Sequence, residues 1–399
     1  MCEYAFNKLN KEWPVWPGTE YDFLKNSGML DFHRSLPSYE PTPLRELPNL
    51  AFRLGLGAVF VKDEAKRFSI NAFKALGASY AIYRFLKKQW QSRFQEPFTP
   101  ASFQDPAALA KLGSFTFCAA TDGNHGRAVA WTAKKLGQKA VIYMPADSVA
   151  ARVENIGGEG AEVVLVDGTF DLCVERCAAD AAKFGWQAIS DTAYEGYREI
   201  PGWILLGYTS LFCELEGTLH QPDRANVDAV ILPAGVGGLA AAGSFYYAKH
   251  YGARRPFLIC VEPVSSDCFL ESVRFGRGEA MATRGKQTSI MAGLNCGTPS
   301  PLAWPIIRDA MHFFLAVGDK WAEQAMYRYF HPLGMDPRIV SGESGSSGLA
   351  ALLALTNADK LAAIRPQLPL DQNSRVLLIN TEGDTDPVNF QRVVATKPG

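Results

Sequence analysis

Residues 115–137 read FTFCAATDGNHGRAVAWTAKKLG, a short apolar run followed by a glycine-containing turn and a longer helical pattern. The first six residues favour a buried β-strand, because they are aromatic, β-branched or small and carry no charge. Residues 124–136 have the apolar spacing of an amphipathic helix, and Gly137 is a suitable residue to end it. This stretch therefore predicts one strand–turn–helix unit of a parallel α/β sheet.

The same pattern repeats along the chain in two series. The first series predicts further strands at residues 139–144, 161–166 and 186–190, and a helix over 170–184 that ends at Gly185. The second series predicts strands at 230–234, 257–261 and 375–380, and a buried helix over 344–356. Strands that alternate with helices of this length are typical of parallel sheets.

The two series predict an α/β protein with two open parallel-sheet domains. We expect a small α/β domain over residues 81–191 and a large domain made of residues 1–80 and 192–399. Residues 1–50 are rich in proline and aromatic residues and weakly periodic, so we expect them to form irregular cover over the large domain. Ligands of such sheets bind at the carboxyl ends of the strands, which predicts an active site in the cleft between the domains.

The composition favours a soluble enzyme that acts on small molecules. The 399 residues are 47% hydrophobic and 20% charged, with a net charge of −1. This near-zero charge gives no electrostatic reason to bind nucleic acid or an anionic membrane. The uncharged run 229–248 contains Pro233 and several glycines, so it is interpreted as a strand, a turn and a helix and not as a membrane span.

Cysteine and histidine are dispersed along the sequence. The eight cysteines include no C-x-x-C pair, and the six histidines do not stand at the spacing of metal ligands. This pattern favours free thiols in a reducing compartment and no metal site. A disulfide between Cys268 and Cys296 is the alternative that stays open. The chain begins without the basic and apolar regions of a secretory signal, so we expect a cytoplasmic location.

A glycine-rich loop lies between a predicted strand and a predicted helix. Its residues are Gly235, Val236, Gly237, Gly238 and Leu239. Backbone without side chains can approach an anion, and a helix N-terminus adds N–H groups and a partial positive charge, so a phosphate is the expected ligand. With Ala240 and Glu262 the loop also fits the dinucleotide fingerprint of nicotinamide enzymes. A tight turn without a ligand is the third interpretation.

Lys74 stands in the string Ser-Ile-Asn-Ala-Phe-Lys-Ala-Leu-Gly-Ala of residues 69–78. A helical pattern starts at this lysine, so its amine is expected near the positive end of a helix and partly removed from water. Both effects lower the pKa of an amine, which favours Schiff-base formation with a carbonyl compound. A solvated surface lysine is the alternative for this position taken alone.

The turn of residues 121–126 offers backbone N–H groups that can hold a substrate carboxylate. Asp122 is unusual at such a place, because one carboxylate repels another. It is interpreted either as a helix N-cap or as an acid/base group near the reacting carbon. His125 taken alone is interpreted as a structural hydrogen-bonding residue.

These three segments, in this order, resemble the fold type II pyridoxal-phosphate enzymes, the group of tryptophan synthase β and threonine dehydratase. The similarity extends from residues 41–44 to the C-terminal strand. It implies that Lys74 carries pyridoxal 5'-phosphate and that the protein is a homodimer. The other implied cofactor contacts are Phe73, Asn124, Gly235, Val236, Gly237, Gly238, Leu239 and Thr381, and the implied substrate-carboxylate contacts are Thr121, Gly123 and His125.

Within this group the chain most resembles the diaminopropionate ammonia-lyases. Asp122 replaces the serine or alanine that precedes Gly-Asn-His elsewhere, and the strings 191–197 and 380–387 also fit. The resemblance implies elimination of ammonia from D- and L-2,3-diaminopropionate, which gives pyruvate and ammonia. It further implies that Lys74 takes the α-proton of the L form and Asp122 that of the D form. Asp122 or Asp191 would attract the β-ammonium group.

Two other functions stay open at this point. A serine or threonine dehydratase of the same fold would release hydroxide in place of ammonia, and Asp122 disfavours it. A nicotinamide-dependent oxidoreductase would explain the glycine-rich loop but would leave Lys74 without a role. The expected partner is a small amino-acid substrate, with no nucleic acid, membrane or metal.

Overall fold

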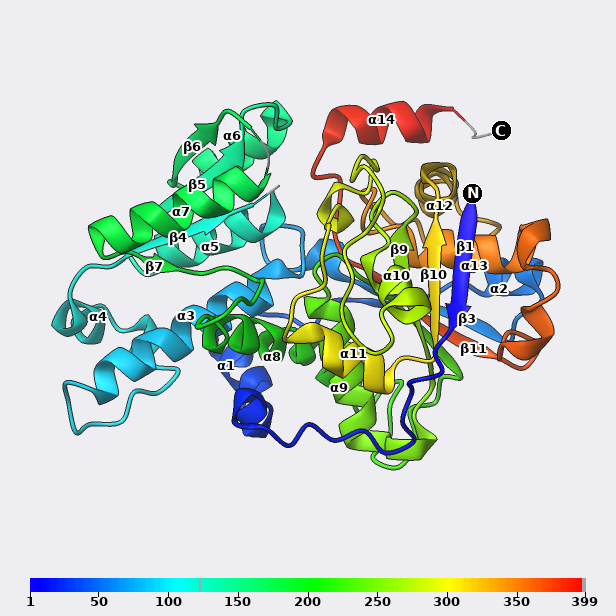
Figure 1. Ribbon diagram of the computed structural model, residues 1–399, viewed down its shortest axis with the longest axis horizontal. Helices are drawn as coiled ribbons and strands as arrows, with labels where there is room; N and C mark the ends of the chain where they lie inside the picture. Colours follow the sequence, from blue (N-terminus) through cyan, green and yellow to red (C-terminus); the bar gives the residue numbers. More distant parts are fainter. Residues whose placement is uncertain (122, 169, 397–399) are drawn as a thin grey trace. The chain divides into compact units, whose positions relative to one another are not determined.

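The computed structural model describes residues 1–121, 123–168 and 170–396 (Figure 1). Its internal contacts divide the chain into two compact units. The larger unit consists of Met1–Pro17, Pro41–Lys66 and Leu211–Gly399, and the smaller unit of Gly18–Glu40 and Arg67–Ser210. Each unit is built on its own sheet.

The smaller unit contains a four-stranded parallel sheet with the order β6-β5-β4-β7. These strands are β4 (Thr116–Ala120), β5 (Lys139–Pro145), β6 (Glu162–Val166) and β7 (Gln187–Ala188). The central strands β4 and β5 are the most buried, in keeping with their nearly continuous apolar sequences. The four strands predicted from apolar runs are confirmed, and β7 is shorter than expected.

Helices α5 (Asn124–Lys135) and α7 (Phe170–Phe184) pack against this sheet and confirm the predicted helices. Each is followed by a glycine with positive φ, Gly137 at 63° and Gly185 at 70°. This is the backbone conformation in which glycine ends a helix at little cost. The other helices of this unit are η1 (Thr19–Lys25), α1 (Met29–Ser35), α3 (Lys74–Gln91), η3 (Ser102–Gln104), α4 (Pro106–Leu112), α6 (Ala150–Gly158) and most of α8 (Glu199–Cys213).

Two glycines allow α3 and α8 to approach closely. A Cβ atom on Gly207 of α8 would lie 2.4 Å from the carbonyl oxygen of Leu76, and one on Gly77 of α3 would lie 2.5 Å from the ring of Tyr208. The ring of His33 on α1 bonds the same Leu76 carbonyl oxygen through Nε2 at 2.9 Å. These contacts fix the first turn of α3 against α8.

The boundaries of the smaller unit, as defined by its internal contacts, differ from those predicted from the sequence. They include α1 and the whole of α3 in this unit, and they extend it to Ser210, whereas the sequence expectation began at residue 81 and ended at 191. The physical reason is packing, because α3 lies along α5 and crosses α8 at the two glycines.

The larger unit contains a seven-stranded sheet with the order β1-β10-β9-β8-β11-β3-β2. Its inner strands run parallel, and the two edge strands are antiparallel to their neighbours. The strands are β1 (Cys2–Phe6), β2 (Leu44–Glu46), β3 (Ala58–Asp63), β8 (Ala229–Pro233), β9 (Phe257–Pro263), β10 (Phe313–Val317) and β11 (Arg375–Asn380). The predicted strands at 230–234, 257–261 and 375–380 are confirmed as β8, β9 and β11.

The expectation that residues 1–50 form only irregular cover is wrong. β1 pairs with β10 and β2 pairs with β3, so this stretch supplies both edges of the large sheet. Cys2 lies opposite Val317, a partner more than 300 residues away. Strands this short depend on such distant partners, which a local pattern does not reveal.

The helices of the larger unit enclose a core of buried aliphatic and aromatic side chains. They are α2 (Pro48–Leu54), η2 (Glu64–Lys66), α9 (Gly238–Tyr251), η4 (Gly252–Arg254), α10 (Cys268–Phe275), η5 (Ala292–Leu294), α11 (Ala303–Ala310), α12 (Asp319–Phe330), α13 (Ser347–Asn357), η6 (Asp359–Leu361), η7 (Arg365–Gln367) and α14 (Pro387–Ala395). The uncharged run 229–248 is β8, a turn and α9, as predicted. Within the described ranges no helix is long and apolar enough to cross a membrane, and no disulfide joins two cysteines.

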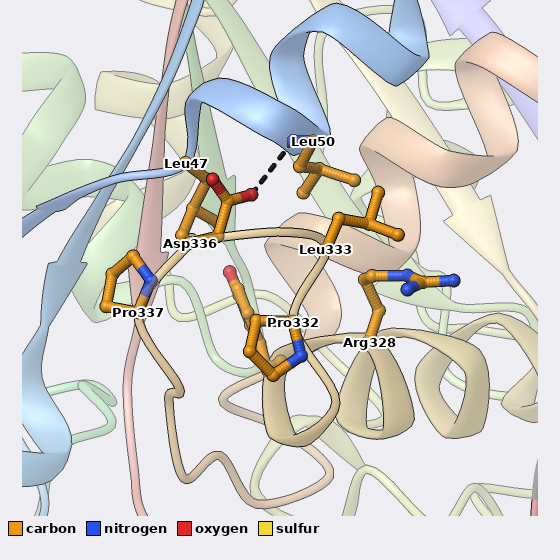
Figure 2. Close-up of a pocket in the computed structure, with 8 residues that line it drawn as sticks. Leu47, Leu50, Arg328, Pro332, Leu333, Asp336 and Pro337 are labelled. Carbon is orange, nitrogen blue, oxygen red and sulfur yellow. Dashed lines mark hydrogen bonds between the residues drawn. The ribbon is translucent and has the colours of Figure 1, made fainter.

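A carboxylate from a distant loop caps helix α2. Asp336 accepts hydrogen bonds from the backbone N–H groups of Asn49 and Leu50 at 2.8 and 2.9 Å, at the edge of a small pocket lined by Leu47 and Leu333 (Figure 2). These are N–H groups of the first helical turn, which have no partner within a helix. Asp336 therefore stabilises α2 and joins it to the segment after α12.

Replacing Asp336 by alanine should lower the free energy of unfolding by about 1–2 kcal/mol, because the buried N–H of Leu50 and the part-buried N–H of Asn49 lose their acceptor. Urea unfolding followed by circular dichroism measures this change. Asp223→Ala removes an exposed carboxylate and should change stability by less than about 0.5 kcal/mol. Equal stabilities of the two variants would contradict the capping role.

Candidate active site

Lys74 is the first residue of α3, and the segment before it has a constrained backbone. Phe68 and Asn71 have positive φ angles of 46° and 53°, which non-glycine residues rarely adopt. Arg127 of α5 donates hydrogen bonds to the carbonyl oxygens of residues 69 and 70, each at 3.3 Å. These bonds hold residues 69 and 70, shortly before α3 begins.

The amine of Lys74 pairs with the carboxylate of Asp191, with Nζ 2.5 Å from Oδ2. The side chains are 20% and 19% exposed, so the pair is partly buried. Burial raises the pKa of Asp191, but the attraction of Lys74 and His125 is greater and leaves this pKa well below its ordinary value. Asp191 is therefore an anion beside the lysine amine.

His125, the second residue of α5, lies next to the same carboxylate. Its Nδ1 is 3.9 Å from Oδ2 of Asp191, and its Nε2 is 2.6 Å from the carbonyl oxygen of Ile189. Because a carbonyl oxygen only accepts, Nε2 carries the hydrogen and donates it. Burial lowers the pKa of His125, so its ring is neutral and Nδ1 is an acceptor. Nδ1 has no hydrogen-bond partner in the part of the chain that the structure describes.

Two aromatic rings lie near the lysine amine. Nζ of Lys74 is 5.4 Å from the ring centre of Phe73 and 5.8 Å from that of Tyr208, and the two rings are 4.7 Å apart. Burial raises the pKa of the Tyr208 hydroxyl, which keeps it protonated. Sequence reasoning missed Tyr208, because its only signal is one polar aromatic residue in an apolar helix.

Thr121 and Gly123 lie between β4 and α5, and residues 124–126 form the start of α5, in keeping with the predicted strand–turn–helix unit. Thr121 shapes this turn, since its Oγ1 accepts hydrogen bonds from the N–H groups of Gly123 and Gly126 at 3.0 and 3.1 Å. A Cβ atom on Gly126 would lie 2.3 Å from Thr121, so this position requires glycine. Asn124 is the first residue of α5. Asp122, the residue most important to the sequence interpretation, lies outside the described residues.

In the larger unit, residues 234–237 join β8 to α9, and Gly238 and Leu239 are the first residues of α9. Gly237 has a φ of 98° and precedes the first residue of the helix. Among the described residues no side chain caps the start of α9, and its first turn contains no acidic residue. The N–H groups at this helix end therefore suit a bound anion, which supports the expected phosphate site.

Glu262 binds backbone groups of its own unit. It is therefore not the free acidic residue that a dinucleotide site requires to bind a ribose. Its carboxylate is fully buried and accepts hydrogen bonds from the N–H groups of Phe269 and Leu270 at 2.8 and 2.9 Å. Burial raises its pKa to about 8. Because α10 occupies both carboxylate oxygens, Glu262 is not available to a ribose, which removes the basis for the nicotinamide interpretation.

Several loops of the larger unit meet beside the glycine-rich loop. A Cβ atom on Gly235 would lie 2.8 Å from the carbonyl oxygen of Gly293, so the two backbones are in close contact. Gly293 donates its N–H to Oγ of Ser344, and Ser344 donates its own N–H to the carboxylate of Glu382, both at 3.0 Å. Thr381, directly after β11, is buried next to Glu382. The glycine-rich loop thus lies against Gly293, which is connected through Ser344 to Glu382, the residue after Thr381.

The sequence analysis assigned residues 344–356 to a helix and gave the run 341–348, SGESGSSG, no role in the site, whereas α13 begins at Ser347. A Cβ atom on Gly345 would lie 2.4 Å from Oδ1 of Asn380 and 2.6 Å from the carbonyl oxygen of Glu382. The tight packing of this run against the end of β11 requires glycine there. A glycine- and serine-rich run that opens a helix was the available signal.

The chemistry of these residues fits a phosphorylated aldehyde cofactor. In the smaller unit an amine stands at a helix start beside a carboxylate. In the larger unit an uncapped helix start suits a phosphate group, and a threonine hydroxyl follows the last strand. Among the described residues no three His, Cys, Asp or Glu side chains form a group that could hold a metal ion.

A family model for pyridoxal-phosphate dependent enzymes matches residues 36–381. The diaminopropionate ammonia-lyase of Salmonella typhimurium is 39% identical over 398 residues, which cover 99% of this chain and 98% of that protein. The protein of the same name from Escherichia coli K12 is 39% identical over 364 residues, which cover 91% of this chain and 89% of that protein.

Solved structures give the same result. The holo diaminopropionate ammonia-lyase of Escherichia coli matches with a TM-score of 0.86 at 36% identity, covering 99% of this chain and 96% of that one. A threonine deaminase from Solanum lycopersicum, at 18% identity and a TM-score of 0.72, shares the fold. The predicted fold class, fold type II with parallel α/β sheets, is confirmed.

Proposed function

The chain belongs to the diaminopropionate ammonia-lyase family of pyridoxal-phosphate dependent enzymes, and from this we propose that it converts D- and L-2,3-diaminopropionate into pyruvate and ammonia. It is a carbon–nitrogen lyase that uses pyridoxal 5'-phosphate. The observation that carries the substrate assignment is the Lys74–Asp191 pair, an amine and a carboxylate 2.5 Å apart. A carboxylate at this place suits a substrate that brings a second ammonium group.

The residues that the family resemblance implies would hold the cofactor as follows. Lys74 would bind its aldehyde carbon, with Phe73 beside the amine and Asn124 at the ring hydroxyl. The phosphate would lie at the start of α9, on Gly235, Val236, Gly237, Gly238 and Leu239, and Thr381 would face the pyridine nitrogen. When bound, pyridoxal phosphate supplies the electron sink that allows the α-proton to leave.

The proton roles follow from the groups that the chain offers. Lys74 would take the α-proton of the L substrate, and Asp122 that of the D substrate, so that a base stands on each face of the α-carbon. Thr121, Gly123 and His125 would contact the α-carboxylate. Asp191, an anion at neutral pH, would attract the β-ammonium group that leaves.

Direct assay tests the proposed function. Purified protein loaded with pyridoxal phosphate should release pyruvate and ammonia from D- and from L-2,3-diaminopropionate. It should show the visible absorbance band of a lysine-bound cofactor, and borohydride should remove that band. Turnover of serine or threonine with kcat/KM above that of both diaminopropionate isomers would favour the dehydratase alternative. Absence of the band in protein offered pyridoxal phosphate would contradict the cofactor role of Lys74.

We also propose that the protein is a homodimer in the cytoplasm. The family resemblance supports the homodimer, and cysteines without disulfides support a reducing compartment. Light scattering on purified protein should give twice the chain mass of 43.7 kDa. A mass of one chain would contradict the dimer, and a periplasmic signal in cell fractionation would contradict the location.

A further inference from the structure

The acceptor Nδ1 of His125 is unusual, because it is buried and yet makes no hydrogen bond to any described residue. The side chain is only 5% exposed, and the bond from Nε2 to Ile189 fixes the orientation of the ring. A buried polar atom without a partner is rare and costly in a folded protein. A partner that the chain itself does not provide would explain it.

The neighbour of this nitrogen indicates the chemical class of that partner. Nδ1 of His125 and Oδ2 of Asp191, here called the His125–Asp191 pair, are 3.9 Å apart. Two acceptors at this separation can both lie about 2.8 Å from one nitrogen atom placed between them. A group with at least two hydrogens directed to different acceptors satisfies both, which a water molecule or an ammonium can do. The negative charge of Asp191 favours the ammonium.

The Lys74 amine shows that an alkyl ammonium group fits against one half of the pair. Its Nζ lies 2.5 Å from the Asp191 oxygen. It does not bond Nδ1 of His125, which therefore remains an acceptor for a second donor. The β-ammonium of diaminopropionate is a group of the same kind, a primary ammonium on a CH2 carbon.

We propose that the His125–Asp191 pair binds the β-ammonium group of the substrate, and that His125 is a specificity-determining residue. This rests on the proposed function and deepens it, because it assigns the preference for an amino over a hydroxyl leaving group to one neutral imidazole. His125 thereby has a role beyond the structural hydrogen bond and the carboxylate contact expected from the sequence.

The departure of ammonia from the β-carbon requires no general acid, so a site with two hydrogen-bond acceptors is suitable. The β-ammonium already carries three hydrogens, so when the C–N bond breaks its electron pair goes to nitrogen and neutral ammonia leaves. The α-proton goes to a base of the protein, and its electron pair completes the Cα–Cβ double bond. A β-hydroxyl group instead needs a proton to leave, which neither an ionised Asp191 nor a neutral His125 supplies.

A hydroxyl also satisfies the pair poorly, because it has one hydrogen for two acceptors. One buried acceptor then stays unpaired, which corresponds to a discrimination of about 10- to 100-fold against serine in kcat/KM. Wild-type protein should therefore prefer D-2,3-diaminopropionate to D-serine, and His125 should contribute about this factor to the preference.

Two substitutions of His125 separate the proposed substrate contact of Nδ1 from the structural hydrogen bond of Nε2. His125→Gln can keep a donor near Nε2 for the Ile189 carbonyl oxygen but has no acceptor at the Nδ1 position, so the ratio of the two kcat/KM values should fall about 10-fold or more. His125→Asn places an amide oxygen close to the Nδ1 position and loses the Ile189 contact. It should keep the ratio within about 3-fold of wild type, even where its stability falls.

The opposite pattern would overturn the proposal. If His125 has only a structural role, His125→Asn should lose more activity than His125→Gln. Each variant should then lower kcat/KM equally for both substrates, so the ratio of the two kcat/KM values stays as in wild type. A wild-type protein that releases no ammonia from diaminopropionate would contradict the proposed function separately from the His125 assignment.

A measurement without turnover tests the pair directly. In protein labelled with 15N-histidine and loaded with cofactor, Nδ1 of His125 should give the signal of an unprotonated ring nitrogen, assigned by its loss in His125→Gln. Propylammonium chloride should shift this signal. It should leave Nδ1 of His312 unchanged, because that nitrogen already accepts from the N–H of Leu258 at 3.0 Å. No shift of the His125 signal at saturating propylammonium would refute binding at the pair.

Discussion

Replacing Lys74 by alanine should reduce ammonia release from L-2,3-diaminopropionate by at least about 10⁴-fold, because one change removes the cofactor linkage and a catalytic base. The variant should also lose the borohydride-fixed cofactor and the visible absorbance band. Lys74 is the first residue of α3, and Arg127 holds the backbone just before it at Ile70. We therefore expect no other lysine to replace it. Steady-state kinetics and the absorbance spectrum measure both effects.

A matched control exists on the same helix. Lys88 of α3 also pairs with a carboxylate, Glu199, at 2.6 Å, but both side chains are more than half exposed. Lys88→Ala should keep the absorbance band and change kcat/KM by less than about 3-fold, because an exposed pair contributes little. Full activity of Lys74→Ala, or equal losses in the two variants, would contradict the assignment.

Removal of Lys74 should also change the pH dependence of stability. Asp191 has a lowered pKa in the folded protein, chiefly because Lys74 and His125 outweigh the effect of burial. Such a group contributes stability above its unfolded pKa of about 3.9, and this contribution is lost as the pH falls through the folded value. The difference in Tm between cofactor-free wild type and Lys74→Ala should therefore be largest near pH 7 and shrink toward pH 3. A difference that is independent of pH would contradict the ion pair.

The parts of the fold that sequence predicted well are those that local patterns determine. The inner strands β4, β5, β8 and β9 are continuous apolar runs, as expected for strands covered on both faces. Edge strands such as β1 do not carry this signal. Its residues are mostly half-buried, and β10, its partner in the sheet, comes more than 300 residues later.

The same distinction holds within the candidate site. The glycine-rich loop and the 121–126 turn were predictable, because each is one continuous string between a strand and a helix. The contact of Asp191 with Lys74 was not, since 117 residues separate them and the close packing of α3 on α8 sets the position of the lysine. The orientation of the His125 ring depends on the carbonyl group of Ile189, which no side-chain pattern encodes.

Asp122→Asn should reduce turnover of D-2,3-diaminopropionate by about 10²- to 10⁴-fold, while kcat/KM for the L isomer stays within about 5-fold of wild type. An amide has nearly the shape of a carboxylate but does not accept a proton at neutral pH. The D and L isomers present their α-protons on opposite faces, so a loss confined to D is the signature of a base that serves one face. Lys74, with its position fixed by α3, remains available to the L isomer.

Two features make the comparison of isomers decisive. Thr121 holds the N–H groups of Gly123 and Gly126, so the turn that carries residue 122 has bonds that do not depend on its side chain, and the variant should keep its fold. Asp147→Asn, an exposed carboxylate just after β5 in the same unit, should leave both isomers unaffected. Equal losses on D and L in Asp122→Asn would mean that residue 122 acts on a step that the isomers share, such as β-ammonium release. In that case the assignment of one base to each face would be wrong.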